Sequence, residues 1–193
     1  MRSYNVRQMV TAALLCGIGV AIPMFSPIRI VLEPASYTLG SHVAIFIGML
    51  ISPAVAVAVS LGTALGFFLG AFPPVVVLRA ATHVIFAWVG AMLLRRNPSL
   101  LGTSMLRTGV FSFGIGIIHA AAEVAVVAGF YFGGAASQAH YISGFVWSVL
   151  ILVGVGSVAH SMLDLGIALI VWRAVTASGG AKSLRPVVSF GRR

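Results

Sequence analysis

Residues 73–87 read Pro-Pro-Val-Val-Val-Leu-Arg-Ala-Ala-Thr-His-Val-Ile-Phe-Ala, and this stretch decides how the chain folds. After the double proline the run is apolar except for Arg79 and His83, which lie four residues apart and therefore share a helical face. An arginine at hydrocarbon depth costs roughly 2.5–3.5 kcal/mol on insertion scales, so it faces a partner, a cavity or a ligand. Two interpretations are open: Arg79 recognises an anionic small molecule, or it pairs with a carboxylate and locks the bundle.

The composition surrounding this stretch is that of a polytopic membrane protein. Hydrophobic residues make up 60% of the chain and charged residues 8%, whereas a soluble domain has about 25% charged residues. With ~20 residues needed for each crossing, 193 residues hold about six helices and leave little room for a soluble domain. The single Cys16 gives no disulfide framework and no cysteine metal site. The net charge of +9 comes from basic residues at helix ends rather than in a patch, so it indicates membrane orientation and no nucleic acid partner.

The hydropathy pattern predicts an all-α integral membrane protein with six transmembrane helices, at 9–26, 39–51, 53–71, 75–94, 108–132 and 141–173. The first is interpreted as a retained helix, because its apolar run is long for a signal peptide and no A-x-A-like site follows it. Residues 27–38 carry Pro27 and Pro34, are too polar to span, and are predicted to form an extended loop, a possible lid over a cavity. Residues 1–175 form a single domain, and 176–193 form a basic tail that we expect to be mobile.

The positive charges set the orientation. With both ends of the chain inside, only Arg29 falls outside and Arg79 within the membrane; the other basic residues lie inside, namely Arg2, Arg7, Arg95, Arg96, Arg107, Arg173, Lys182, Arg185, Arg192 and Arg193. The positive-inside rule therefore predicts an N-in, C-in arrangement with an even number of spans.

This orientation brings several polar and aromatic side chains together in the outer half of the bundle. The predicted binding residues are Arg79, His83, Glu123, Trp147, Tyr141 and His119. A few convergent polar groups within apolar and aromatic walls are typical of a small-molecule site. The alternative for Glu123 is a pair with Arg79 that satisfies both charges without a ligand. His160 and Asp164 are expected near the inner face, joined by a buried hydrogen bond.

Small residues mark two helix faces for close packing. Gly62, Gly66 and Gly70 repeat at spacing four in the third span. A similar stripe in the first span, formed by Ala13, Gly17 and Ala21, either packs inside the bundle or docks a partner subunit.

The chain carries no motif for ATP hydrolysis or for metal-dependent catalysis. Residues 179–183 read Gly-Gly-Ala-Lys-Ser, but Ala181 replaces the second glycine of a phosphate loop and no strand precedes it. The sequence has no H-E-x-x-H zinc motif and no pair of aspartates for metal-dependent phosphoryl chemistry. No cofactor and no metal are expected. A small intramembrane enzyme using His119 beside Glu123 is the alternative class of function.

Three segments resemble the substrate-binding S components of bacterial energy-coupling factor (ECF) vitamin transporters, most closely the niacin-specific member. They are Ile22-Pro23-Met24, residues 34–43 (Pro-Ala-Ser-Tyr-Thr-Leu-Gly-Ser-His-Val), and residues 61–67 (Leu-Gly-Thr-Ala-Leu-Gly-Phe) continuing through 72–80 (Phe-Pro-Pro-Val-Val-Val-Leu-Arg-Ala). The likeness covers roughly residues 10–90 and is architectural beyond them. The stripe is similar to the family's A-x-x-x-A motif, with Gly17 in place of the central alanine.

The resemblance implies a non-enzymatic, high-affinity vitamin-binding subunit in the bacterial cytoplasmic membrane. It implies that the stripe docks on a membrane-embedded T component, that two ATP-binding-cassette ATPases supply the energy, and that the subunit reorients in the membrane to deliver vitamin inside. Nicotinate suits the residues, since one guanidinium takes a carboxylate bidentately, Trp147 or Tyr141 can stack on the ring, and His83 or Glu123 can address the ring nitrogen. Pantothenate and other carboxylate vitamins also suit an arginine and stay open as alternatives.

Overall fold

The computed structural model describes residues 6–102, 104–134 and 143–190 and is mainly helical. The helices and strands, in chain order, are α1 (Val6–Phe25), β1 (Arg29–Leu32), β2 (Ala35–Thr38), α2 (Val43–Ile51), α3 (Pro53–Leu69), α4 (Pro74–Arg96), the 3-10 helix η1 (Pro98–Leu101), α5 (Met105–Phe132), the π-helix η3 (Val146–Val155), α6 (Gly156–Ala177) and the 3-10 helix η4 (Lys182–Leu184). The predicted all-α class is confirmed.

Four helical segments of the described chain are long and apolar enough to cross a membrane: α1, α4, α5 and the continuous 32-residue segment of η3 and α6. α3 has 17 residues, and α2 has only nine, too few for a full crossing that needs ~20 residues. The segment predicted as a span at 39–51 is therefore a half-length helix, since the chain before it forms β2 and a turn. The last helix continues to Ala177, beyond the predicted end at residue 173.

Local sequence explains where the central helices begin. Ser52 caps α3 by accepting a hydrogen bond from the backbone N–H of Val55 at 3.2 Å, and Pro53 occupies the first turn, where its missing N–H costs nothing. Pro74 likewise occupies the first turn of α4, although the residue before it, Pro73, provides no side-chain cap. Residues 73–87, which contain Arg79 and His83, therefore begin at one end of the bundle and run inward along α4.

The glycine face of α3 packs against α1. Gly62 lies against Cys16 and Gly66 against Val20, so closely that a side-chain carbon at either glycine would overlap its neighbour. The predicted close-packing face is confirmed at these two positions, whereas Gly70 is the C-cap of α3. α3 also packs on α4, which fixes α4 at the centre of the molecule.

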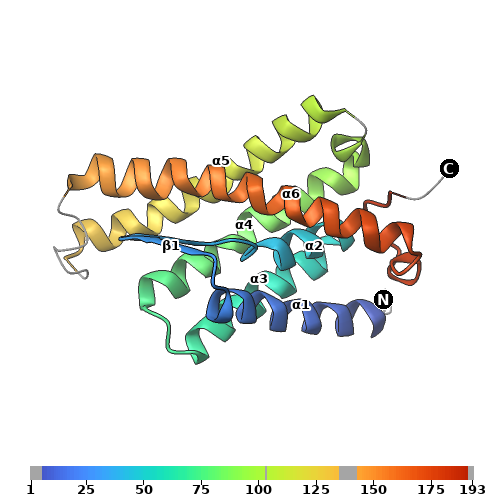
Figure 1. Cartoon of the computed structure of the whole chain (residues 1–193), viewed down its shortest axis with the longest axis horizontal. Helices are drawn as coiled ribbons and strands as arrows, with labels where there is room; N and C mark the ends of the chain where they lie inside the picture. The colour runs from blue at the N-terminus through green and yellow to red at the C-terminus, as the bar shows by residue number, and fades with distance from the viewer. Residues whose placement is uncertain (1–5, 103, 135–142, 191–193) are drawn as a thin grey trace.

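The segment expected as an extended loop is a β-hairpin. β1 and β2 pair antiparallel, with Arg29 opposite Thr38 and Leu32 opposite Ala35. All four residues of β1 are exposed, whereas Ala35 and Thr38 of β2 are buried, so the hairpin covers the bundle with one strand and turns the other outward. Figure 1 shows the hairpin lying along the helices between α1 and α6.

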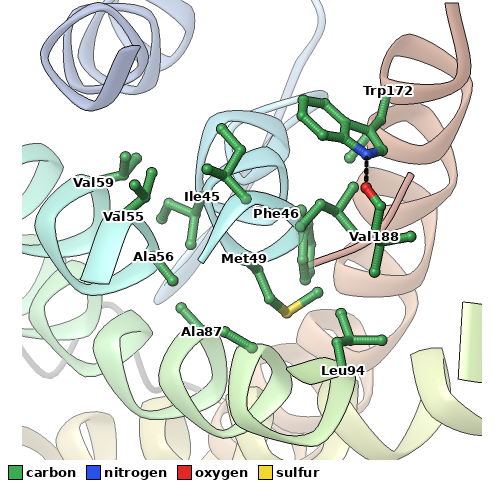
Figure 2. Packing of buried hydrophobic residues seen from close by; sticks show 14 of the residues in the cluster. Ile45, Phe46, Met49, Val55, Ala56, Val59, Ala87, Leu94, Trp172 and Val188 are labelled. Atoms are coloured by element: carbon green, nitrogen blue, oxygen red, sulfur yellow. Dashed lines mark hydrogen bonds between the residues drawn. The ribbon is translucent and has the colours of Figure 1, made fainter. Parts of the chain in front are cut away.

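The segment after α6 folds back onto the bundle. The indole N–H of Trp172 donates to the carbonyl of Val188 at 2.8 Å, as Figure 2 shows, and the backbone N–H groups of Val187 and Val188 donate to the carbonyls of Ile51 and Leu50 at the end of α2. Residues up to 190 therefore belong to the packed domain, in contrast to the mobile tail expected from its basic composition. Apolar side chains such as Val188 explain the difference, because they are buried in the core.

Both ends of the described chain lie at the same end of the bundle. Figure 1 shows this end on the right, together with the connection between α4 and α5, while the connection between α3 and α4 lies towards the other end. Arg95, Arg96 and Arg107 flank the α4–α5 connection, so they lie at the same end as the two chain ends.

Candidate functional site

A cavity of about 220 Å³ lies between the hairpin and helices α3, α4 and α6. This volume is below the ~300 Å³ at which pockets for drug-sized ligands begin, so the cavity suits a small molecule. Tyr37 and Thr38 of β2 and the aromatic rings of Phe67 and Phe72 form much of its wall. Its polar lining comes from one cation, several histidines and a carboxylate, namely Arg79, His42, His83, His160 and Glu123.

Arg79 is the cation of the site and is only 6% exposed. Its Nη2 donates to Glu123 Oε2 at 3.0 Å, and its Nη1 reaches the carbonyl of Pro34 in the hairpin turn at a long 3.5 Å. Its Nε is buried and has no hydrogen-bond partner among the described residues. Arg79 therefore pairs with a carboxylate, as one of the two interpretations had it, and it keeps a donor that the described chain leaves unused.

Glu123 joins three helices at the base of the cavity. Besides Arg79 of α4, it accepts from the hydroxyl of Ser157 in α6 at 2.5 Å and lies 3.3 Å from Nε2 of His83. His119, one turn earlier on α5, places Nε2 at 3.5 Å from Oε1 of the same carboxylate, too far for a strong hydrogen bond. A single carboxylate thus holds the polar groups of α4, α5 and α6 in place.

Four histidine rings from four elements pack beside this carboxylate. The ring centroid of His42 lies 4.6 Å from that of His83, 4.7 Å from that of His119 and 4.9 Å from that of His160. Asp164 of α6 fixes His42 by accepting from its backbone N–H at 2.9 Å and by pairing with its Nδ1 at 3.1 Å.

His160 and Asp164 belong to this cluster, which corrects the prediction that they lie apart near the inner face. That prediction measured depth from an assumed helix end at residue 173. Because α6 continues to Ala177, His160 lies near the middle of the segment from Val146 to Ala177. The short α2 completes the arrangement by starting at mid-depth, which brings His42 to the cluster.

The structure brings together four of the predicted binding residues, Arg79, His83, His119 and Glu123. It does not bring Trp147 to them, because this side chain is 53% exposed on η3 and does not line the cavity. Tyr141 lies outside the described residues. The aromatic residue that does line the cavity is Tyr37, and the signal that could have found it is its place in the stretch between Pro34 and His42.

Tyr37 connects the hairpin to the π-helix. Its hydroxyl donates to the carbonyl of Leu152 in η3, and its ring lies 5.3 Å from that of His160. Burial raises the pKa of Tyr37 to about 12, so its hydroxyl stays protonated and able to donate over the physiological range. A π-helical turn is rare and often marks a functional site, and here it lies against the strand that covers the cavity.

The small-residue stripe of α1 faces away from the bundle. Ala13 and Gly17 are exposed, Ala21 is partly buried, and a side-chain carbon at Gly17 would meet nothing within 4 Å. The buried face of α1 is formed instead by Ala12, Leu15 and Gly19. The alternative that the stripe packs inside the bundle is therefore not supported within the described chain.

These features define a class: a multi-pass, all-α membrane protein that holds a small enclosed site around a buried arginine. Comparison with known proteins identifies the family. The niacin transporter NiaX of Lactococcus lactis subsp. cremoris (strain MG1363) is 37% identical over 165 residues, which are 86% of this chain and 72% of that protein. No family model matches the chain, and neither does a solved structure. The chain belongs to the NiaX family of transporters, which confirms the resemblance drawn from the sequence.

Proposed function

We propose that this chain is the substrate-binding S component of an ECF-type importer that takes up niacin, as nicotinate, through a bacterial cytoplasmic membrane. The relation to a niacin transporter supports the vitamin, and a transport role accounts for the chain without a catalytic step. The single observation that carries the chemistry is the buried guanidinium of Arg79 with its unused Nε–H beside a small cavity.

The carboxylate of nicotinate binds Arg79. Charge-assisted hydrogen bonds between a guanidinium and a carboxylate are short and strong, and a buried donor without a partner costs about 1–3 kcal/mol until a ligand satisfies it. Glu123 already occupies Nη2, so it holds the guanidinium in place and leaves the Nε–H for the ligand. Nicotinamide has no negative charge and would bind more weakly.

The ring of nicotinate lies among the aromatic walls. Tyr37, Phe67 and Phe72 line the cavity and provide apolar surface for a flat pyridine ring. The histidines beyond Arg79 then face the polar ring nitrogen. The modest volume of the cavity, about 220 Å³, suits the compact nicotinate.

The orientation that we propose has both ends of the chain in the cytoplasm and six passes, in one of which the short α2 crosses together with the hairpin that precedes it. The basic residues that flank the α4–α5 connection lie at the end where both described chain ends are found, which accords with the positive-inside rule. The hairpin then covers the cavity from the outer side, where vitamin arrives.

Energy comes from partner subunits in this proposal. The exposed stripe formed by Ala13, Gly17 and Ala21 docks on a T component, because small residues let a second helix approach closely. Two ATPases hydrolyse ATP, and this subunit reorients in the membrane to release vitamin inside.

The test is calorimetric titration of the detergent-purified full-length protein with nicotinate, nicotinamide and pantothenate. We expect saturable nicotinate binding and much weaker binding of the other two. Arg79→Ala removes the partner of the carboxylate and should weaken nicotinate binding by roughly 30-fold or more, as expected when one member of a buried, hydrogen-bonded charge pair is lost. Arg96→Ala, at the exposed end of the same helix, should bind like the wild type. Unchanged binding in a folded Arg79→Ala protein would contradict the proposed role of Arg79.

A further inference from the structure

Three buried histidines meet beside the cavity, and two of them have ring nitrogens that the described chain leaves without a hydrogen-bond partner. They are His42, which precedes α2, His83 of α4 and His119 of α5, and one ring nitrogen from each lies within 4.8 Å of the others. Nδ1 of His83 and both ring nitrogens of His119 are buried without a hydrogen-bond partner among the described residues. His119 is only 1% exposed, so bulk solvent does not reach these unused nitrogens.

A carboxylate oxygen lies near one ring nitrogen of each of these three histidines. Asp164 Oδ2 is 3.1 Å from Nδ1 of His42, and Glu123 Oε1 is 3.3 Å from Nε2 of His83 and 3.5 Å from Nε2 of His119. Histidines that bind metal ions almost always turn their second nitrogen to a carboxylate or a carbonyl, which fixes the tautomer and leaves the opposite nitrogen as the ligand. Each of the three rings therefore has a carboxylate oxygen within 3.5 Å of one ring nitrogen, which can serve as such an outer partner once a metal ion orients the ring.

The charges of the site also favour a positively charged ligand. Glu123 and Asp164, two of the three acidic residues in the chain, are buried here, and Arg79 is the arginine that pairs with this cluster. With neutral histidines these groups sum to one negative charge, and bound nicotinate would raise the sum to two. An uncompensated charge is costly in a buried site, and a divalent cation would cancel these two charges.

We propose that His42, His83 and His119 hold a divalent transition-metal ion and that its open coordination position receives the ring nitrogen of nicotinate. The second half of this proposal rests on the proposed function. Three imidazoles suit late first-row ions such as Zn²⁺, and three protein ligands with one open position are typical of sites where the ion meets a small molecule. The ion would draw the nitrogens closer together than they lie in this structure, to ~2.0–2.1 Å from the metal.

The open coordination position of the metal ion would face the cavity in which nicotinate binds. His42 and His83 form part of the cavity lining, and Arg79 lies one helical turn from His83. The ring nitrogen of nicotinate is meta to its carboxylate, so a molecule held by Arg79 presents that nitrogen across the ring towards the histidines. A metal ion would thereby recognise the feature that separates nicotinate from benzoate.

A second group, His42 with His160 and Asp164, also lies within metal-ligand reach, but its carboxylate is already engaged. Asp164 Oδ1 accepts from the backbone N–H of Gly40 at 2.8 Å, and its Oδ2 accepts from the backbone of His42. Asp164 therefore acts as the outer partner of His42, and His160 serves as the matched control residue outside the proposed ligand set.

No metal was predicted from the sequence, because it has no H-E-x-x-H motif, no cysteine site and no aspartate pair, and these three histidines lie 41 and 36 residues apart. Only the fold brings them together. The test begins with the metal content of the full-length wild-type protein by mass spectrometry, before and after treatment with EDTA and after reloading with Zn²⁺. We expect a single tightly held ion per chain, its loss in His119→Gln, and its retention in His160→Gln.

The second measurement is binding of nicotinate and benzoate to the EDTA-treated and the Zn²⁺-loaded wild-type protein. Removing the metal should weaken nicotinate binding about tenfold or more. Benzoate should lose less affinity, because it loses only the charge compensation and has no ring nitrogen to lose. In protein loaded with Co²⁺, nicotinate should shift the visible absorption bands of the ion and benzoate should not. This measurement needs no variant and so does not depend on how His119→Gln folds.

The outcomes separate the two proposals. Equally tight nicotinate binding in metal-free protein overturns the contact between the ion and the ring nitrogen and leaves the proposed function standing. Zn²⁺ bound equally by wild type and by folded His119→Gln overturns the metal site itself. A protein that holds Zn²⁺ at these histidines but binds no nicotinate, loaded or unloaded, overturns the proposed function together with the contact to the ring nitrogen.

Discussion

At the scale of single residues, the pair of Arg79 and Glu123 decides the stability of the empty site. Both side chains are buried, and breaking a buried pair by removing one charge costs about 3–5 kcal/mol, because the remaining charge loses its compensation. We therefore expect Glu123→Gln to lower the thermal unfolding temperature of the protein without ligand, and nicotinate to restore part of the loss by giving Arg79 a new anion. Arg96→Gln, at the exposed end of α4, should have little effect. A Glu123→Gln protein as stable as the wild type would show that the pair is not needed.

The sequence predicted the residues whose position depends on helical spacing alone. Arg79 and His83, like His119 and Glu123, lie four apart on one face, and both pairs meet in the structure. His42 was missed as a member of the site because its depth depends on the short α2. Trp147 was chosen by depth, which does not determine the face of a helix, and the π-helical segment around it departs from the 3.6-residue period.

At the scale of elements, the hydroxyl of Tyr37 holds the hairpin against the π-helix. Removing it in Tyr37→Phe should cost about 1 kcal/mol of stability, the usual net contribution of a hydrogen bond. The pKa of Tyr37 rises from 10 to about 12 on folding, so its contribution is complete below pH 10 and is lost as the pH rises through 12. Tyrosine absorbance during an alkaline titration should contain a late component near pH 12 that Tyr37→Phe lacks. An identical titration curve for the variant would contradict this assignment.

The hairpin was only partly predictable from the sequence. Pro27 and Pro34 correctly excluded a helix at 27–38, because proline restricts its own backbone and that of the residue before it. The pairing of β1 with β2 did not follow, since β1 is an exposed apolar strand without alternation and β2 is a short mixture of small, polar and aromatic residues. Similarly, basic composition favoured a mobile tail, whereas burial of a few apolar residues such as Val188 fixes the segment.

At the scale of the whole molecule, composition was sufficient to predict an all-α membrane protein, because a chain with so few charges cannot cover a soluble surface. The lengths of the helices were harder to predict from the sequence. Six apolar runs were visible, yet α2 is half-length and the last helix is extended, and these two lengths set the depth of His42, His160 and Asp164. Which residues belong to the site therefore depends on how the helices pack in the folded bundle.

Two glycines on facing helices separate the stability of the bundle from its assembly with partners. Gly66 of α3 lies against Val20, so Gly66→Leu should push α1 away and impair both folding and nicotinate binding. Gly17 of α1 faces outward with nothing within 4 Å, so Gly17→Leu should fold and bind nicotinate like the wild type. If the stripe docks on a T component, Gly17→Leu should nevertheless lose ATP-driven nicotinate uptake in proteoliposomes containing all subunits, because a bulky side chain keeps the partner helix at a distance. Normal uptake by Gly17→Leu would mean that the T component contacts another surface, and the exposed apolar residues of β1 would then be the next to change.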